Sequence, residues 1–187
     1  MDGWTRRLIA WGAMIAPALH TVTDAMEWAQ GGFSAPQLWI NYVAFVPLPA
    51  IVLGLYAAQR PAIGRLGLAG ALAYGYAFIY FAHTTLVALA TAAPDYETLW
   101  TGLGAMYTAH GLIMIAGGLA FGWASLQARV LPRIAVTAFL IGILLNTALG
   151  LLPVPDLLQT LGSTVRNLGL IGMGWALISP PPGSPAR

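Results

Sequence analysis

Three histidines, two carboxylates and one arginine lie within long apolar stretches of this sequence. They are His20, His83, His110, Asp24, Glu27 and Arg166. An ionisable side chain in such surroundings is costly and is a functional-site hypothesis by default. Amide and phenol side chains in the same stretches could line a cavity around them: Asn41, Tyr80, Tyr107, Asn146 and Asn167. The set predicts one polar site inside an otherwise apolar protein.

The three imidazoles allow more than one chemistry. They could bind a divalent metal ion, with Asp24 or Glu27 as a fourth ligand or as an acceptor behind the ligands. Alternatively, His83 and His110 could be the axial ligands of haem b, with Arg166 facing a propionate. In a third interpretation the histidines are buried hydrogen-bonding groups that join helices. Since the sequence has no H-E-x-x-H segment, the spacing does not choose between these possibilities.

The carboxylates suggest acid–base chemistry. Asp24 and Glu27 could act as general acid and base, one kept protonated by apolar surroundings and the other ionised beside Arg166 or a protonated histidine. Arg166 could hold an anion or a developing negative charge, and it could equally form an intramembrane ion pair with Asp24 or Glu27. Such a site suits a lipid-soluble substrate with one polar group.

The elements that must position these residues are membrane helices. The chain has 187 residues, of which 58% are hydrophobic and 7% are charged, compared with about 25% charged residues in a typical soluble domain. Breaks at proline, glycine and charge separate six stretches that can each cross about 30 Å of hydrocarbon. The expected spans are 8–29, 38–58, 66–92, 101–126, 134–152 and 158–178, in a single domain over 1–178. The proline-rich tail 179–187 is expected to be disordered.

The basic residues, all of them arginine, predict the orientation of the chain. Except for Arg166, they lie outside the expected spans: Arg6 and Arg7, Arg60 and Arg65, Arg129 and Arg133, and Arg187. These positions precede the first span, follow the second and the fourth, and end the chain. The positive-inside rule therefore predicts a multi-pass protein of the inner, cytoplasmic membrane with both termini inside.

Under this topology the charged residues share one depth. The three histidines and Arg166 each lie about eight or nine residues from the outer end of a span, roughly 12–14 Å below the outer surface. Asn146 is shallower, and Asp24, Asn41 and Glu27 lie nearer the outer mouth. Because the inner half has no comparable group, we expect a single cavity that opens outward.

The helical faces agree with these depths. His20, Asp24 and Glu27 follow a spacing of i, i+4 and i+7, so they share one side of the first helix. Related spacings occur in the third and fourth spans: Tyr76, Tyr80 and His83, then Tyr107, His110 and Met114.

Small residues and prolines predict how these helices pack. Gly142 and Gly150 flank Asn146 at four-residue intervals, which allows a neighbouring helix to approach closely. Pro47 and Pro49 should bend the second span near its middle.

Several classes of protein have no support in the sequence. There is no Walker loop, no dinucleotide fingerprint and no G-x-S-x-G elbow, so we expect no nucleotide partner and no serine hydrolysis of that kind. The arginines form no stripe that a phosphate backbone could follow, so we expect no nucleic acid partner. Since the chain has no cysteine, disulfides and thiolate metal sites are excluded.

The segment from His20 to Asp24, together with Asn and Trp residues in the spans, resembles the acid–base face of sterol isomerases of the emopamil-binding type. The likeness covers five residues and includes a Glu-for-Asp difference. The expected six spans also differ from that family, so the resemblance implies no residue role or activity for this chain.

We therefore predict an all-α integral membrane protein, a six-transmembrane-helix bundle. Its leading predicted function is a membrane-embedded enzyme that acts on a lipid-soluble substrate by acid–base or metal-assisted chemistry. Its expected partners are the lipid bilayer and this small molecule. Two alternatives stay open: a b-type haem electron carrier linked to quinol, and a small-solute transporter or accessory membrane subunit. The sequence leaves the substrate, the cofactor and the oligomeric state undetermined.

Overall fold

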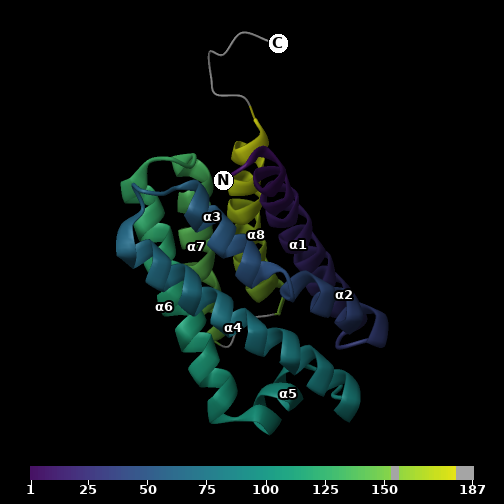
Figure 1. The fold of residues 1–187 in the computed structure, drawn as a ribbon. Coiled ribbons are helices and arrows are strands. Elements are labelled where there is room, and N and C mark those ends of the chain that lie inside the picture. Colours follow the sequence, from purple (N-terminus) through teal and green to yellow (C-terminus); the bar gives the residue numbers. More distant parts are fainter. Residues whose placement is uncertain (153–155, 180–187) are drawn as a thin grey trace.

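The computed structural model describes residues 1–152 and 156–179. Within these residues the protein is helical and has no strands, and the helices lie side by side in a bundle (Figure 1). In chain order they are α1 (Gly3–Gln30), α2 (Ala35–Phe45), α3 (Leu48–Ala58), α4 (Gly64–Thr91), α5 (Tyr96–Leu103), α6 (Ala105–Ala128), α7 (Arg133–Gly150) and α8 (Asp156–Ile178). Most of the tail expected to be disordered lies outside the described residues.

Four segments of the described chain are long and apolar enough to cross a membrane: Ala35–Ala58, Gly64–Thr91, Ala105–Ala128 and Arg133–Gly150. They correspond to α2 with α3, α4, α6 and α7. The prediction of a helical membrane protein is supported to this extent. Helices α1 and α8 are comparably long, but they carry His20, Asp24 and Arg166, which reduce their apolar character.

Two helix starts differ most from those expected. The helix expected over 101–126 begins at Ala105, because Gly104 has a φ of 55° and a ψ of −134° and separates it from α5. The helix expected from residue 8 already begins at Gly3. Asp2 caps it there by accepting a hydrogen bond of 2.8 Å from the backbone N–H of Thr5.

The second expected span is interrupted where its prolines predict. Helix α2 ends at Phe45 and α3 begins at Leu48, because Pro47 lacks a backbone N–H and its ring clashes with the preceding turn. This break leaves α2 against α1. There the Phe45 ring lies edge-on to the imidazole of His20, with centroids 4.7 Å apart.

Glycines bring helix backbones together at two interfaces. A Cβ on Gly117 of α6 would lie 2.5 Å from the backbone nitrogen of Tyr74 on α4. A Cβ on Gly142 of α7 would overlap the backbone nitrogen of Arg166 on α8. The close approach predicted at Gly142 is therefore confirmed. The prediction at Gly150 is wrong, because a Cβ there would meet no atom of the described structure within 4 Å.

Helices α1 and α8 pack antiparallel (Figure 1). Near the start of α1, Nε of Arg6 donates to the carbonyl of Leu177 near the end of α8, at 2.7 Å. Farther along α1, His20 meets Arg166 of α8. This pairing places the start of α1 and the end of α8 at the same end of the bundle.

Candidate polar site between α1 and α8

His20 is the centre of a hydrogen-bonded group inside the bundle. Its Nδ1 lies 3.1 Å from Nη2 of Arg166, and its Nε2 lies 3.3 Å from Oδ1 of Asp24. The exposed fractions are 8% for His20 and 3% for Arg166. The imidazole therefore stands between a cation on α8 and a carboxylate on its own helix. One interpretation of the sequence pairs Arg166 directly with Asp24 or Glu27, whereas in the structure His20 joins Arg166 to Asp24.

These contacts assign the tautomer of His20. A guanidinium only donates hydrogen bonds, so Nδ1 of His20 must accept from Arg166. The ring proton is then on Nε2 and is donated to Asp24. A neutral imidazole with this tautomer links two opposite charges whose sum is zero, which reduces the cost of burying them.

Asp24 has a second partner that sequence reasoning did not find. The hydroxyl of Ser163 on α8 donates a hydrogen bond to Oδ2 of Asp24. The same hydroxyl lies 2.9 Å from the carbonyl of Thr160, but its single proton favours the carboxylate, which is the stronger acceptor. Ser163 precedes Arg166 by three residues, so the helical spacing places it on the same face of α8. That spacing is the signal by which it could have been found.

Arg166 uses only part of its donor capacity. Besides His20, Nη2 contacts Oδ1 of Asn167 at 3.4 Å, and Nη1 reaches only Sδ of Met114 at 3.8 Å. Nε is buried and has no hydrogen-bond partner among the described residues. A thioether is a weak acceptor, and buried cations are normally fully hydrogen-bonded. Arg166 therefore keeps N–H donors that the described residues do not use.

Two of the three predicted asparagines extend this group to neighbouring elements. Nδ2 of Asn167 donates to Oγ1 of Thr21 at 3.0 Å, which adds a second link between α8 and α1. The hydroxyl of Thr23 lies 3.3 Å from Oδ1 of Asn41 on α2. Both threonines are further contacts that sequence reasoning did not find. They fix the rotation of α1 so that His20 faces α8.

His110 lies in a different, aromatic environment. Its ring stacks on Tyr80 with centroids 3.7 Å apart and an angle of 12°, and its Nδ1 lies 2.7 Å from the carbonyl of Met106. On the same helix, the hydroxyl of Tyr107 donates a hydrogen bond to the hydroxyl of Tyr96 on α5. Helix α5 thus contributes to this aromatic group, although the sequence predicts no separate helix there.

Helix α5 begins at a capping carboxylate outside the long helices. Asp95 accepts a hydrogen bond of 2.8 Å from the backbone N–H of Thr98, and this bond lowers the pKa of Asp95. The cap fixes the first turn, from which Tyr96 reaches Tyr107.

The structure does not bring the three histidines into one cavity. His83 is exposed on α4, and Tyr76 on the same side of that helix is 54% exposed. No group of three histidine, aspartate or glutamate side chains in residues 1–152 and 156–179 is placed to hold a metal ion. The predicted metal site on His20, His83 and His110 is therefore not supported. The predicted haem pair of His83 and His110 is not supported either, because one ring is on the surface and the other is stacked on Tyr80.

Two further predicted residues, Glu27 and Asn146, lie beside the hydrogen-bonded group around His20. Glu27 is half-buried near the end of α1, one turn beyond Asp24. Asn146 is half-buried on α7, and its backbone lies against Gly162 of α8, where a Cβ would come within 2.7 Å of its nitrogen.

The network around His20 is packed rather than open. The described structure has cavities of about 310 Å³ and 240 Å³, and neither is lined by His20, Asp24 or Arg166. The smaller cavity lies between Phe33 and Ala88, and the larger lies at the opposite end of the bundle, beside Arg6. The expected outward-opening cavity is not one of these two, and His20 makes direct contacts with Phe45 and Arg166.

Comparisons of this protein with known family models, with curated proteins and with solved structures give no match.

Proposed function

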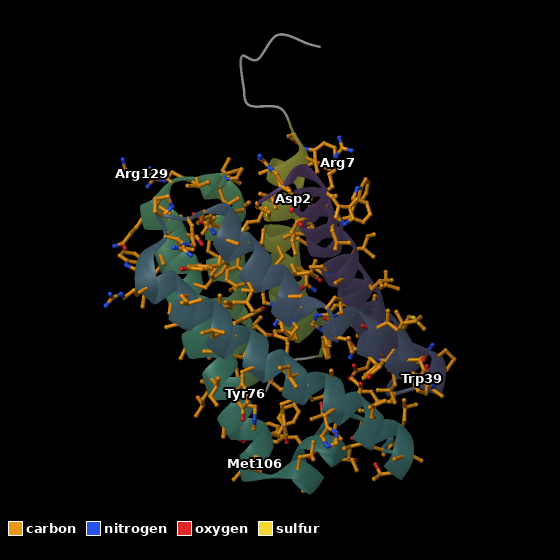
Figure 2. All side chains as sticks on the ribbon, in the orientation of Figure 1. Asp2, Arg7, Trp39, Tyr76, Met106 and Arg129 are labelled. Atoms are coloured by element: carbon orange, nitrogen blue, oxygen red, sulfur yellow. The ribbon has the colours of Figure 1, made fainter. Side chains whose placement is uncertain are left out.

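We propose that the chain crosses the membrane six times, with α1 and α8 as the spans added to the four apolar segments. The antiparallel packing of α1 against α8 supports this topology. Figure 2 shows Arg7 and Arg129 at one end of the bundle, and Trp39 and Met106 toward the other. The positive-inside rule makes the arginine end cytoplasmic, which favours an inner-membrane protein with both termini inside.

We propose further that this protein is a membrane-embedded enzyme that acts on a lipid-soluble substrate by acid–base chemistry. The observation that carries the proposal is the buried Arg166 guanidinium, which is linked to Asp24 through His20 and still has unused donors. Removal of a proton from a carbon next to a carbonyl group needs two parts. One is a carboxylate that accepts the proton, and the other is a cation that faces the carbonyl oxygen.

The proposed reaction needs no co-reactant. Asp24 removes a proton from a carbon next to the substrate carbonyl, and the electron pair moves onto the carbonyl oxygen. The free N–H groups of Arg166 stabilise this oxygen. In a substrate with a carbon–carbon double bond beyond this carbon, the proton returns at the far end of that double bond. This return restores Asp24, reforms the carbonyl and leaves the double bond next to it, which completes an isomerisation. His20 holds Asp24 in place through Nε2, and Ser163 holds its other oxygen.

Apolar residues around the network suit the body of such a substrate. The Phe78 ring lies 5.8 Å from Cζ of Arg166, Met114 contacts Nη1 of Arg166, and the Phe45 ring contacts that of His20. Because the site is packed, the substrate enters when α2 separates from α1. The break at Pro47 is the hinge about which α2 moves.

An experiment in deuterated water tests this function with an unidentified substrate. Purified protein in detergent is incubated with a total lipid extract of the expressing cells in D₂O, and the extract is analysed by mass spectrometry. We expect at least one lipid to gain deuterium or to change retention time. Asp24→Asn should abolish the change, whereas Asp95→Asn, which removes a carboxylate outside the network, should retain it. An extract unchanged by the folded wild-type protein would refute the proposal.

The packed state of the network favours a second candidate, a transporter or an accessory membrane subunit without catalytic activity. In that case the network serves to hold α1 against α8. The same experiment separates the two candidates, since the second predicts no lipid change even with the folded wild-type protein.

A further inference from the structure

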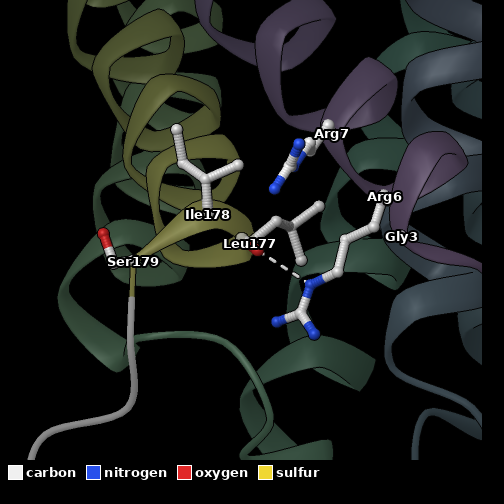
Figure 3. Close-up of a pocket in the computed structure, with 6 residues that line it drawn as sticks. All are labelled: Gly3, Arg6, Arg7, Leu177, Ile178 and Ser179. Atoms are coloured by element: carbon white, nitrogen blue, oxygen red, sulfur yellow. Dashed lines mark hydrogen bonds between the residues drawn. The ribbon is translucent and has the colours of Figure 1, made fainter. Parts of the chain in front are cut away.

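The larger cavity lies far from the His20 network, where α1 begins and α8 ends. It has a volume of about 310 Å³. Its lining comes from the first turns of α1 and the last turn of α8: Gly3, Arg6, Arg7, Leu177, Ile178 and Ser179 (Figure 3). The cavity thus lies at the end of the bundle that the arginines mark.

Two guanidinium groups with spare donors face this cavity. Nε of Arg6 is bonded to the Leu177 carbonyl at 2.7 Å, which leaves both of its terminal nitrogens without a hydrogen bond among the described residues (Figure 3). Arg7 makes no hydrogen bond or ion pair in the described part of the chain. Two such groups at one cavity match the oxygens of a phosphate.

No described residue of the cavity wall neutralises these charges. The described lining contains no carboxylate, and the nearby Asp2 accepts two hydrogen bonds of 2.8 Å from Thr5. The bond from the Thr5 backbone lowers the pKa of Asp2, so this carboxylate stays ionised but is directed to α1 itself. Arg6 also covers the carbonyl of Leu177, which offsets the negative end of α8.

An apolar stripe leads away from the cavity along α1. Trp11, Ile15 and Val22 follow Arg7 on one side of the helix and are 55%, 52% and 51% exposed. Trp4, one turn before Arg7, is 75% exposed, and exposed tryptophans of this kind mark the headgroup level. The basic cavity matches the charged headgroup of a lipid, and the exposed apolar stripe that continues from it matches the acyl chain.

We propose that this cavity binds the phosphate of an anionic phospholipid, with the headgroup at Arg6 and Arg7 and an acyl chain along Trp11 and Ile15. Basic pockets between spans on the cytoplasmic side bind anionic headgroups in this way. The site is independent of the proposed reaction at Asp24 and rests only on the proposed topology.

Native mass spectrometry of the full chain tests this site. The protein is released from micelles that contain equal amounts of phosphatidylglycerol and phosphatidylcholine. We expect the wild type to retain phosphatidylglycerol in preference, and Arg7→Gln to reduce that preference about fivefold. Arg7→Gln breaks no hydrogen bond of the described structure, so folding should be unaffected. The matched control is Arg129→Gln, which removes the same charge at the same end of the bundle and should keep the preference.

Other outcomes would overturn the proposal. An equal loss of preference in Arg7→Gln and Arg129→Gln would mean a diffuse effect of charge rather than a site. Displacement of the bound lipid by an excess of inorganic phosphate would identify a site for free phosphate instead. The lipid measurement does not use enzymatic activity, so its failure is distinguishable from failure of the experiment in D₂O.

Discussion

Nη2 of Arg166 lies 3.1 Å from Nδ1 of His20, and this contact joins the last helix of the bundle to the first. Because Asp24 is bonded to the other nitrogen of the same ring, a change at Arg166 reaches the carboxylate through the imidazole. The three side chains should therefore behave as one unit in stability and in chemistry.

The first prediction concerns the proton positions on two buried histidines. His20 accepts from Arg166 at Nδ1 and should carry its proton on Nε2. His110 has Nδ1 only 2.7 Å from the carbonyl of Met106, so its proton should be on Nδ1. Nitrogen-15 NMR of histidine-labelled protein distinguishes the two tautomers, with His20→Gln and His110→Gln to assign the signals. The same tautomer in both residues would contradict the assigned network.

The second prediction is that Asp24 and Arg166 are energetically coupled. Removing one partner of a buried charge pair costs about 3–5 kcal/mol, so Asp24→Asn and Arg166→Gln should each destabilise the protein strongly. The double variant should lose less than the sum, with a coupling of at least about 1 kcal/mol. Unfolding in mixed detergent micelles measures these free energies.

Gln59→Ala, combined with Arg166→Gln, gives a control for this double-mutant cycle. Gln59 bonds Ser125 at 3.1 Å and belongs to a separate buried contact between α3 and α6. Its effect should add to that of Arg166→Gln without coupling. Equal coupling in both cycles would indicate a general loss of structure instead of a specific network.

The sequence indicates which charged residues can share a level of the bundle, but it does not indicate the rotation of each helix. The sequence predicts one level for His20 and Arg166, and these residues touch. It predicts the same level for His83, yet that residue is exposed on α4. In a soluble protein the polar face of a helix points to water, whereas lipid is as apolar as a helix interface. The spacing of polar residues on α4 therefore does not indicate which side of the helix faces the lipid.

A third prediction follows from the lowered pKa of Asp95. The carboxylate form caps α5, so the cap stabilises the first turn above the ordinary carboxyl pKa near 3.9. Its contribution should be lost as the pH falls through the lower pKa of the folded state. Exchange of the Thr98 amide, normalised for the intrinsic rate, should therefore accelerate in acid.

Asp95→Asn provides the control for this titration. An asparagine also caps a helix, but it has no carboxyl proton to gain. Protection of the Thr98 amide should be independent of pH in this variant. A parallel loss in wild type and Asp95→Asn would assign the acid effect to another group.

Ser163 shows why part of the network is hidden at the level of sequence. Serine and threonine are common in membrane helices, so a single hydroxyl carries little information. Its role becomes visible only when the antiparallel packing places it opposite Asp24. The same reason applies to Thr21 and Thr23. The charged residues indicate where the polar site lies, whereas the hydroxyl residues that complete it require the packing of α1 against α8.

The fourth prediction links the packing of α7 to the position of Arg166. A Cβ on Gly142 would overlap the backbone of Arg166, and a helix backbone cannot give way as a flexible side chain can. Gly142→Ala should therefore push α8 away from α7, shift Arg166 relative to His20 and destabilise the protein by about 1–3 kcal/mol or more.

Gly150→Ala on the same helix is the control for this substitution, because a Cβ there meets no neighbouring atom of the described structure. It should be neutral or slightly stabilising, since alanine is favoured over glycine in helices by roughly 0.5–1 kcal/mol. Thermal unfolding of both variants, with the His20 NMR signal as a second measurement, compares the two positions. If Gly142→Ala left both the melting temperature and the His20 signal unchanged, the close contact of α7 with Arg166 would not be what positions the guanidinium.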